Sequence, residues 1–432
     1  MKNTKIFAAA LIAALGFTAC AKDGGEKIDN GANGVGSVTI TVGKATETRA
    51  EGSSTTTEPS TGVENEVNMI EFFSFDAGAP TTTGAYFRKN TNTIAGATTF
   101  LVTAGDISFL AVVNGSLFAD KDAYDAYLGG KNLADIKKLV ADLALTSATS
   151  QTAPVTGTGF VMAAEATAVT VTAGETNNLS MGLNRVLSKV MAPALKAGTG
   201  GSVESSLMAD AQAMQTLFGV DIDGSDTVEE IEWVYDGYVV INGIKNSYNF
   251  RYTGWTGWTA PFKTPDVAAS WNKATYVAGT TPEGSTIATV YAGNGSTEDT
   301  NDKFIAASNT APVFVYENRP TRAQATPGSA TVFAQDEVTA FLIKGHFVAK
   351  VNNTAGTVSP TRYWRVNLLK ADAWDVYRNS VYRLFMDEVK TIGWGTPKEA
   401  EEDGPIVDPA ESSISIDLVI NNWDLRTEAV DL

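Results

Sequence analysis

The last apolar segment of the chain has a strict two-residue period. An apolar residue stands at every second position: Ile414, Ile416, Leu418 and Ile420. Because successive side chains of a β-strand point to opposite faces, these four side chains share one face. The pattern predicts a strand with one face to bury, and Trp423 and Leu425 supply a further anchor at its end.

The rest of the chain shows the same preference for short strands. Runs of Val, Ile, Thr, Tyr and Phe are separated by Gly, Asn, Asp and Thr, which is typical of β-sandwiches rather than helical bundles. The chain has 432 residues, 44% of them hydrophobic, so two or three domains are expected. We predict strands at residues 68–75, 85–88, 98–103, 107–114, 159–162, 168–172, 183–191, 237–242, 248–252, 286–291, 313–316, 337–351, 362–369 and 382–389.

Two helices interrupt the predicted strands. One begins at the capping residue Asn132 and has an apolar stripe of Leu133, Ile136, Leu139, Val140 and Leu143. The other covers residues 205–218. Residues 396–410 are rich in Pro and acidic residues and are expected to form a solvated linker that leads to the terminal strand.

The first twenty residues have the pattern of a bacterial lipoprotein signal. Lys2 and Lys5 precede an apolar run that ends at Phe17 and is too short to span a bilayer as a permanent helix. Small residues then lead to Cys20, the only cysteine of the chain. We expect Cys20 to be lipidated and to become the mature N-terminus, which tethers the chain without a transmembrane helix. The alternative is an ordinary signal peptide with an incidental cysteine.

A second alternating segment lies close to the beginning of the chain. Val38, Ile40 and Val42 predict a short strand, and the following residues 44–61 are rich in Thr, Ser and Glu without a large apolar side chain. Arg49 lies in this accessible stretch. If a protease cut between Arg49 and Ala50, the strand could leave its sheet, and the terminal strand of another copy could fill the gap. The alternatives are that Arg49 is a solvated loop charge and that the terminal strand belongs to its own domain.

Charge and rare residues exclude several classes of function. The net charge of −17 argues against nucleic acid as a partner, because nucleic-acid binding requires basic surface. One cysteine allows no intramolecular disulfide, and the single histidine, His346, excludes a multi-histidine metal site. No phosphate loop, nucleophile elbow or paired metal motif occurs, so we expect no cofactor and no enzymatic activity.

Two constellations leave binding functions open. Asp221, Asp223, Ser225 and Glu232 have the spacing of a calcium-binding loop, but Asp226 replaces the glycine of the sharp turn, so an acidic turn is the alternative. The aromatic residues Tyr248, Phe250, Tyr252, Trp255 and Trp258 could stack on a glycan or pack within the protein.

Several segments together resemble a known family, the fimbrial shaft subunits of Bacteroidales of the FimA or minor-fimbrillin type. The resemblance rests on the Phe17–Cys20 lipobox, Thr48-Arg49-Ala50, residues 159–162, the Arg/Lys strand of residues 183–190, residues 340–346, residues 378–384 with residues 392–397, and the terminal strand. It implies a mostly β fold of two tandem transthyretin-like β-sandwich domains with a few short helices. It also implies lipoprotein export, cleavage after an arginine by an Arg-specific protease, and polymerisation by strand exchange.

Mapped onto this chain, the resemblance predicts five segments. These are a lipoprotein signal peptide (1–20), a tether with the removable strand (21–49), an N-terminal sandwich (50–190), a C-terminal sandwich (191–396), and a linker with the donor strand (397–432).

The resemblance also implies a role, a location and partners. We expect a structural subunit of cell-surface fimbriae, made as an outer-membrane lipoprotein precursor, that supports adhesion. Its expected partners are other copies of itself, accessory tip and anchor proteins, the protease, and ligands on host or bacterial surfaces. A tip or anchor subunit, or a surface glycan-binding lipoprotein, is the alternative.

Overall fold

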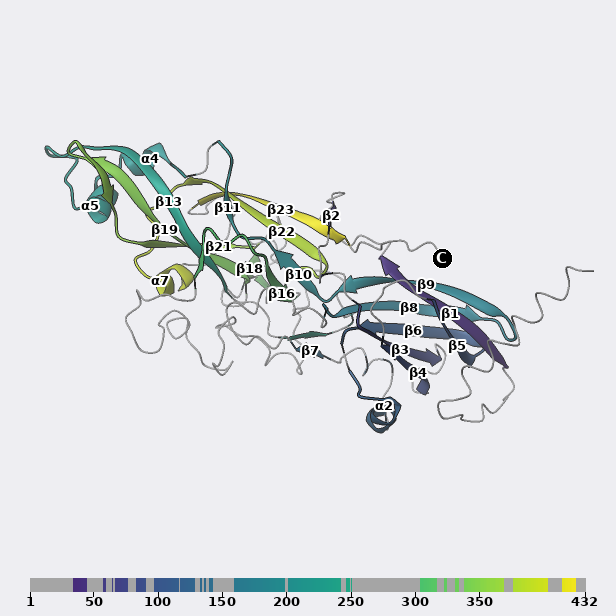
Figure 1. Cartoon of the computed structure of the whole chain (residues 1–432). Coiled ribbons are helices and arrows are strands. Elements are labelled where there is room, and N and C mark those ends of the chain that lie inside the picture. Colours follow the sequence, from purple (N-terminus) through teal and green to yellow (C-terminus); the bar gives the residue numbers. More distant parts are fainter. Residues whose placement is uncertain are drawn as a thin grey trace, which may run out of the picture.

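The computed structural model describes residues 34–44, 57–59, 64, 67–76, 83–90, 97–115, 117–128, 133, 136, 140–142, 159–198, 201–241, 246–248, 250, 304–316, 322–324, 331–333, 338–368, 376–402 and 414–424. Strands dominate the described part and form two β-sandwiches that follow one another along an elongated molecule (Figure 1). The prediction of a mostly β protein with sandwich packing and a few short helices is confirmed.

The first sandwich is built from one continuous path of strands in the order β4-β3-β6-β8-β9-β1-β5. Strands β8 and β9 pair only at Met162–Arg185 and Ala163–Asn184, so the path turns there. The three-stranded part β9-β1-β5 then faces the four-stranded part across a shared apolar core. The strands are β1 (Val35–Lys44), β3 (Met69–Asp76), β4 (Thr83–Asn90), β5 (Ala97–Thr103), β6 (Gly105–Val113), β8 (Met162–Val171) and β9 (Thr176–Arg185).

Strands β3 and β6 are buried on both faces. One face contributes Phe72 and Phe109 to the core shared with β1. The opposite face contributes Phe73 and Leu110 to a second cluster, which is covered by helix α2 (Lys121–Leu128) through Tyr124. Covering on both faces explains why apolar residues occupy both faces of these strands rather than alternating with polar ones.

The second sandwich contains two larger sheets. One has the order β16-β10-β22-β23-β2 with β11 and β12 also on β22, and the other has the order β15-β13-β19-β20 with β21 also on β19. Their shared core includes Trp233, Phe341, Trp364 and Leu384. The first sheet contains β2 (Thr57–Pro59), β10 (Leu187–Val190), β11 (Ala194–Leu195), β12 (Ser202–Val203), β16 (Val313–Tyr316), β22 (Ser380–Val389) and β23 (Ile414–Asp424). The second contains β13 (Val228–Ile241), β15 (Ile305–Ala306), β19 (Ala340–Val351), β20 (Thr354–Val358) and β21 (Arg362–Asn367).

Two small strand pairs complete the described sheets. They are β7 (Val140–Asp142) with β14 (Asn246–Tyr248), and β17 (Arg322–Gln324) with β18 (Thr331–Phe333). The first pair joins the two halves of the chain, and Phe250, two residues after β14, is buried in the aromatic cluster of the first sandwich. The second half of the chain therefore braces the first sandwich.

The helices differ from the predicted ones. Helix α2 was not predicted; Asp120 caps it by accepting a hydrogen bond from the Ala123 N–H at 2.8 Å. Leu133 and Ile136 are helical as expected, but Val140 lies in strand β7. The predicted helix of residues 205–218 is divided into α4 (Ser205–Met208) and α5 (Ala211–Phe218), because Asp210 caps a new helix start.

The region expected to be a linker begins with a helix. Helix α7 (Pro397–Glu402) has a capping box in which Thr396 and Glu399 bond each other's backbone N–H groups. Ala400 on this helix is fully buried against the sheet that contains Leu342 and Tyr363. The predicted strand at residues 159–162 begins only at Met162, and that at residues 286–291 lies outside the described residues. Within the described part of the chain, no helix is long and apolar enough to cross a membrane.

Candidate functional site

Strand β1 is the central strand of the three-stranded part of the first sandwich. We call its position between β5 and β9 the seat of β1. Strand β1 runs antiparallel to β5 on one edge and parallel to β9 on the other, and it is paired along nearly its whole length on both edges. Val38 and Ile40 are 0% exposed and point into the core with Phe72 and Phe109. Both predicted side chains therefore face inward, and the backbone of Val42 continues the strand. A strand in this position is part of the core although it precedes the rest of the sandwich in sequence.

The seat of β1 has one closed end. There the side chain of Asn177 donates to the carbonyl oxygen of Ser37 at 3.1 Å and also bonds the backbone of the turn between β8 and β9. Gly36 passes this turn so closely that a Cβ atom would lie 2.7 Å from the carbonyl oxygen of Thr172. Asn177 thus bonds Thr172 within the turn as well as Ser37 of β1, so the turn has hydrogen bonds that do not depend on β1.

Removal of β1 would leave an empty strand position rather than a flat surface. The facing edges of β5 and β9 would stand roughly 9.5 Å apart, which is two strand spacings. Their backbone N–H and C=O groups would lose their partners, and the positions of Val38 and Ile40 would open in the core. Such a groove can recognise an extended backbone with apolar side chains at every second residue.

The predicted modification sites lie outside the described residues. These are Cys20 and the Arg49–Ala50 bond. Strand β1 ends at Lys44 and β2 begins at Thr57, so Arg49 lies in the stretch of chain that joins the two sandwiches' strands. A cut at Arg49 would separate β1 from everything that follows it.

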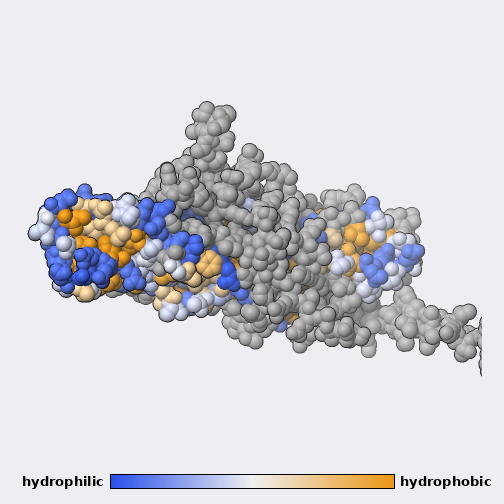
Figure 2. Space-filling model, turned by 90° about the horizontal axis from the view of Figure 1, so that it is seen from above, coloured by the Kyte–Doolittle hydropathy of each residue, from blue (hydrophilic) through white to orange (hydrophobic). Residues whose placement is uncertain are grey.

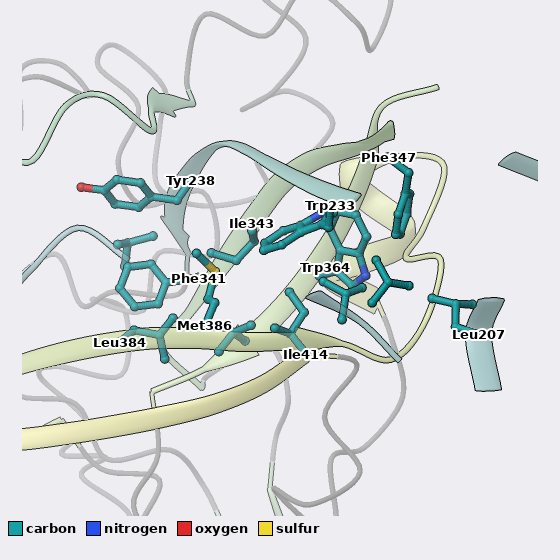
Figure 3. Packing of buried hydrophobic residues seen from close by; sticks show 14 of the residues in the cluster. Leu207, Trp233, Tyr238, Phe341, Ile343, Phe347, Trp364, Leu384, Met386 and Ile414 are labelled. Carbon is teal, nitrogen blue, oxygen red and sulfur yellow. The ribbon is translucent and has the colours of Figure 1, made fainter. Parts of the chain in front are cut away.

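The terminal strand β23 lies in the second sandwich of its own chain. It pairs antiparallel with β22 from Ser380–Asn422 to Val389–Ile414, with an irregularity near its beginning. Ile414 is fully buried and packs in the core close to Met386, Leu384 and Trp364 (Figure 3). The backbone register places Ile416, Leu418 and Ile420 opposite Met386, Leu384 and Tyr382, and Trp423 opposite Glu58, while Leu425 lies outside the described residues.

The far edge of β23 is only partly covered. Strand β2 pairs in parallel with Asn422–Asp424 and with no other described part of β23. The terminal strand therefore has one full neighbour and a three-residue contact, whereas β1 has two full neighbours.

A buried polar cluster lies where the two sandwiches meet. Strand β9 ends at Arg185, β10 begins at Leu187, and Val186 between them is 0% exposed. The Arg185 guanidinium donates to the carbonyl oxygen of Glu64 at 2.9 Å and 3.2 Å, and Lys189 Nζ lies 2.6 Å from the Glu64 carboxylate. Asn379, the residue before β22, accepts from the Arg185 backbone N–H at 3.4 Å and donates its own backbone N–H to the Leu187 carbonyl oxygen.

These junction residues were not predicted as a site. The signal was present as two cations in the apolar strand of residues 183–190, which need buried anionic or carbonyl partners. The missing information was that Glu64, more than a hundred residues earlier, supplies both partners. The cluster anchors the chain just after β2, close to the end of β22 that faces Asn422.

The weak calcium candidate has a different arrangement. Asp226 accepts from the Asp221 backbone N–H at 2.9 Å and from the Asn352 side chain at 2.8 Å, and these bonds hold the pKa of Asp226 below its ordinary value. Asp221, Asp223 and Ser225 are exposed in the loop, and Glu232 is exposed on β13. Among the described residues, which include all four, no group of three His, Cys, Asp or Glu side chains is placed to hold a metal ion.

Only two of the five aromatic candidates, Tyr248 and Phe250, lie in the described part of the chain. Tyr248 lies in β14, and Phe250 is 2% exposed within the first sandwich, so Phe250 cannot stack on a ligand. Tyr252, Trp255 and Trp258 lie outside the described residues. His346 is half-buried on β19 with its Nδ1 2.7 Å from the Asp236 carboxylate.

The surface contains one further area of interest. Figure 2 shows apolar residues gathered at the end of the second sandwich that is remote from the first, bordered by hydrophilic residues. Large exposed apolar side chains among the described residues include Leu195, Met208, Val358 and Trp394. Nothing in the structure indicates what covers them.

One family model matches the first half of the chain. The model of the major fimbrial subunit protein (FimA) family matches residues 36–214, which begin in β1 and end in α5. No curated protein is significantly similar in sequence.

Several solved structures are similar to the chain. A fimbrilin (FimA) of Porphyromonas gingivalis W83 has 12% identity and a TM-score of 0.46, over 90% of this chain and 98% of that chain. A protein of Bacteroides eggerthii described as a cell adhesion protein has 15% identity and a TM-score of 0.45, over 91% and 97%. The tip fimbrial protein Mfa3 of Porphyromonas gingivalis, with a C-terminal truncation, has 12% identity and a TM-score of 0.43, over 90% and 100%. Residues 36–214 of the chain are thus similar to the major fimbrial subunit protein (FimA) family.

Proposed function

We propose that this protein is the shaft subunit of a cell-surface fimbria that polymerises by strand exchange. The similarity of residues 36–214 to the FimA family supports a fimbrial, adhesive role and assembly with other fimbrial subunits. The finer steps are lipidation at Cys20, cleavage after Arg49, departure of β1, and insertion of the terminal strand of another copy into the vacated seat.

The central position of β1 carries this proposal. Val38 and Ile40 are fully buried, yet the only covalent link from β1 to the strands that follow it is the chain that contains Arg49. Hydrolysis of the Arg49–Ala50 bond turns a covalent part of the fold into a dissociable strand. An edge strand in the same place would leave no groove when it departed.

The pairing of the strands also favours transfer of the terminal strand to the seat of β1. On β22 it forms one full ladder, whereas the seat of β1 offers two. Each ladder hydrogen bond contributes about 0.5–1.5 kcal/mol net. Each inward Ile or Leu side chain that becomes buried contributes about 1.5–3 kcal/mol. The second ladder and the two apolar positions opened by β1 therefore oppose the association cost of about 4–15 kcal/mol.

The test is the N-terminal sequence of the protein taken from the cell surface, together with an Arg49→Ala variant. Wild-type protein in fibres should begin at Ala50. Arg49→Ala should be exported and folded but should form no fibres, because β1 remains attached.

The matched control is Lys44→Ala, which removes the nearest other basic residue and should leave both processing and fibres unchanged. Fibres assembled from Arg49→Ala with β1 still attached would contradict the proposal. A lipidated Cys20 at the N-terminus of the assembled protein would favour an anchor subunit instead.

A further inference from the structure

Strand β2 connects the two strands of the proposed exchange: it follows β1 in the chain and pairs with β23. It is the first described segment after Arg49, and it pairs with Asn422–Asp424 at the end of β23. Along the chain, β2 is bounded on one side by β1 in the first sandwich and on the other by Glu64 at the junction. One short stretch of chain therefore connects the seat to be vacated with the strand that is to be donated.

Glu64 is an anchor that the cut does not disturb. Its carboxylate is paired with buried Lys189 at 2.6 Å, and its carbonyl oxygen accepts from Arg185. Glu64 lies on the retained side of the Arg49–Ala50 bond, so β2 stays tethered near β23 after processing. Before processing, β2 is held at both ends, which limits the freedom that it must give up to pair with β23.

We propose that β2, anchored by Glu64, is a clasp that keeps the terminal strand on β22 until the chain is cut. The inference rests on the proposed strand exchange and adds that a single cut activates both ends of the subunit. The cut frees β1 from the acceptor seat, and it also leaves β2 with a free end, which weakens its grip on β23.

The arrangement prevents premature assembly. An uncut copy has its acceptor seat filled by β1 and its donor strand held by β22 and β2. If the donor strand were free earlier, its alternating apolar face would be exposed before any groove existed, which is an aggregation hazard. Figure 1 shows the C-terminal ends of β1 and β23 both directed toward the region where the sandwiches meet, as a shared control segment requires.

The experiment measures hydrogen exchange of the β23 amides in the full chain, before and after cutting with an Arg-specific protease. The key variant is Thr57→Pro/Glu58→Pro, which removes the two remaining N–H donors of β2, because Pro59 has none. Its matched control is Ser53→Pro/Ser54→Pro, which places the same two prolines between Arg49 and β2. Exchange of β6, in the core of the first sandwich, reports whether each variant is folded.

In the uncut wild type, β23 should exchange slowly, and cutting should speed its exchange about tenfold, the change expected for losing a hydrogen bond or two. Thr57→Pro/Glu58→Pro should show that faster exchange without a cut, and cutting should then add little. Glu64→Gln should act in the same direction. If it also loosens β6, it has lost its fold, and the proline variant decides.

Unchanged β23 exchange in Thr57→Pro/Glu58→Pro, or an equal rise in the control, would overturn the clasp. Fibre growth is recorded in parallel. Wild-type protein that forms fibres, together with β23 hydrogen exchange that does not change in the β2 variant, would contradict the clasp and leave the proposed strand exchange intact. If β23 responds as expected but Ala50-started protein never forms fibres, the clasp stands and the proposed function fails.

Discussion

Burial decides what an ion pair contributes in this molecule. Lys189–Glu64 and Lys121–Asp125 have the same 2.6 Å separation, but the first pair is 11% and 4% exposed and the second is 54% and 49% exposed. An exposed helical pair contributes about 0.3–0.5 kcal/mol because water screens it. A buried pair lacks that screening, and removing one partner deprives the other of its nearest counter-charge.

Lys189→Met should therefore lower the free energy of unfolding by about 3–5 kcal/mol, the usual cost of orphaning a buried charge. Lys121→Met, the matched surface variant, should change it by less than about 0.5 kcal/mol. Denaturant titration of the uncut chain measures both. The double variant Lys189→Met/Glu64→Gln should recover part of the loss, because it no longer leaves a buried carboxylate unpaired. Equal effects of the two lysine variants would contradict the argument from burial.

Strands with a clear period were predictable, and contacts between distant segments were not. The alternation of Val38, Ile40 and Val42 and that of residues 414–420 identified β1 and β23 from sequence. Strands β2 and β7 have three residues each, too few to show a period, so tertiary pairing alone creates them. Helix α7 was taken for a linker because its composition is acidic, although Pro397 and Ala400 on it are buried.

Whether each strand is central or at the edge of its sheet also could not be predicted from the sequence. Alternation says that one face of a strand is buried, but not whether its edges are covered. That β1 is central and β23 nearly an edge follows only from the pairing of β5, β9 and β22, which are distant in the chain. This difference in edges is what strand exchange would use.

A matched pair of isoleucines tests whether processing removes the contribution of β1 to the free energy of unfolding. Ile40 on β1 and Ile70 on β3 belong to the same core cluster and are 0% and 4% exposed. In the uncut chain, each substitution by alanine should lower the free energy of unfolding by about 2–5 kcal/mol, the cost of a cavity in a packed core.

After processing and loss of β1, the two substitutions should differ. Ile70→Ala should still destabilise the subunit, whereas Ile40→Ala should have no effect, because its side chain has left with the strand. Thermal unfolding of processed monomers provides the comparison. An Ile40→Ala effect that survived processing would mean that β1 stays in its seat.

At the scale of the whole molecule, the proposed acceptor and the proposed donor are on different sandwiches. The β1 seat lies in the first and β23 in the second, so an exchange between copies joins unlike surfaces. A contact between unlike surfaces repeats without closing unless its rotation happens to form a ring, and it therefore generates a filament. In the proposed filament, the buried junction would hold the two sandwiches of each copy together. Val186 is the only residue between β9 and β10, and Phe160 packs on Phe314 across the boundary, with ring centroids 4.6 Å apart.

This polarity predicts that a copy with a groove but no donor strand terminates growth. Deleting residues 417–432 keeps Ile414, which is buried in the second core, while removing most of the strand. Processed copies of this variant should accept one strand and offer none, so fibres grown with an increasing fraction of them should become steadily shorter in electron micrographs. Uncut Arg49→Ala copies, added in the same proportions, should leave fibre length unchanged because their groove is occupied and their donor strand stays paired with β22 and β2. If the truncated copies also left the length unchanged, growth would not depend on the terminal strand, and the joint between subunits would have to lie on another surface.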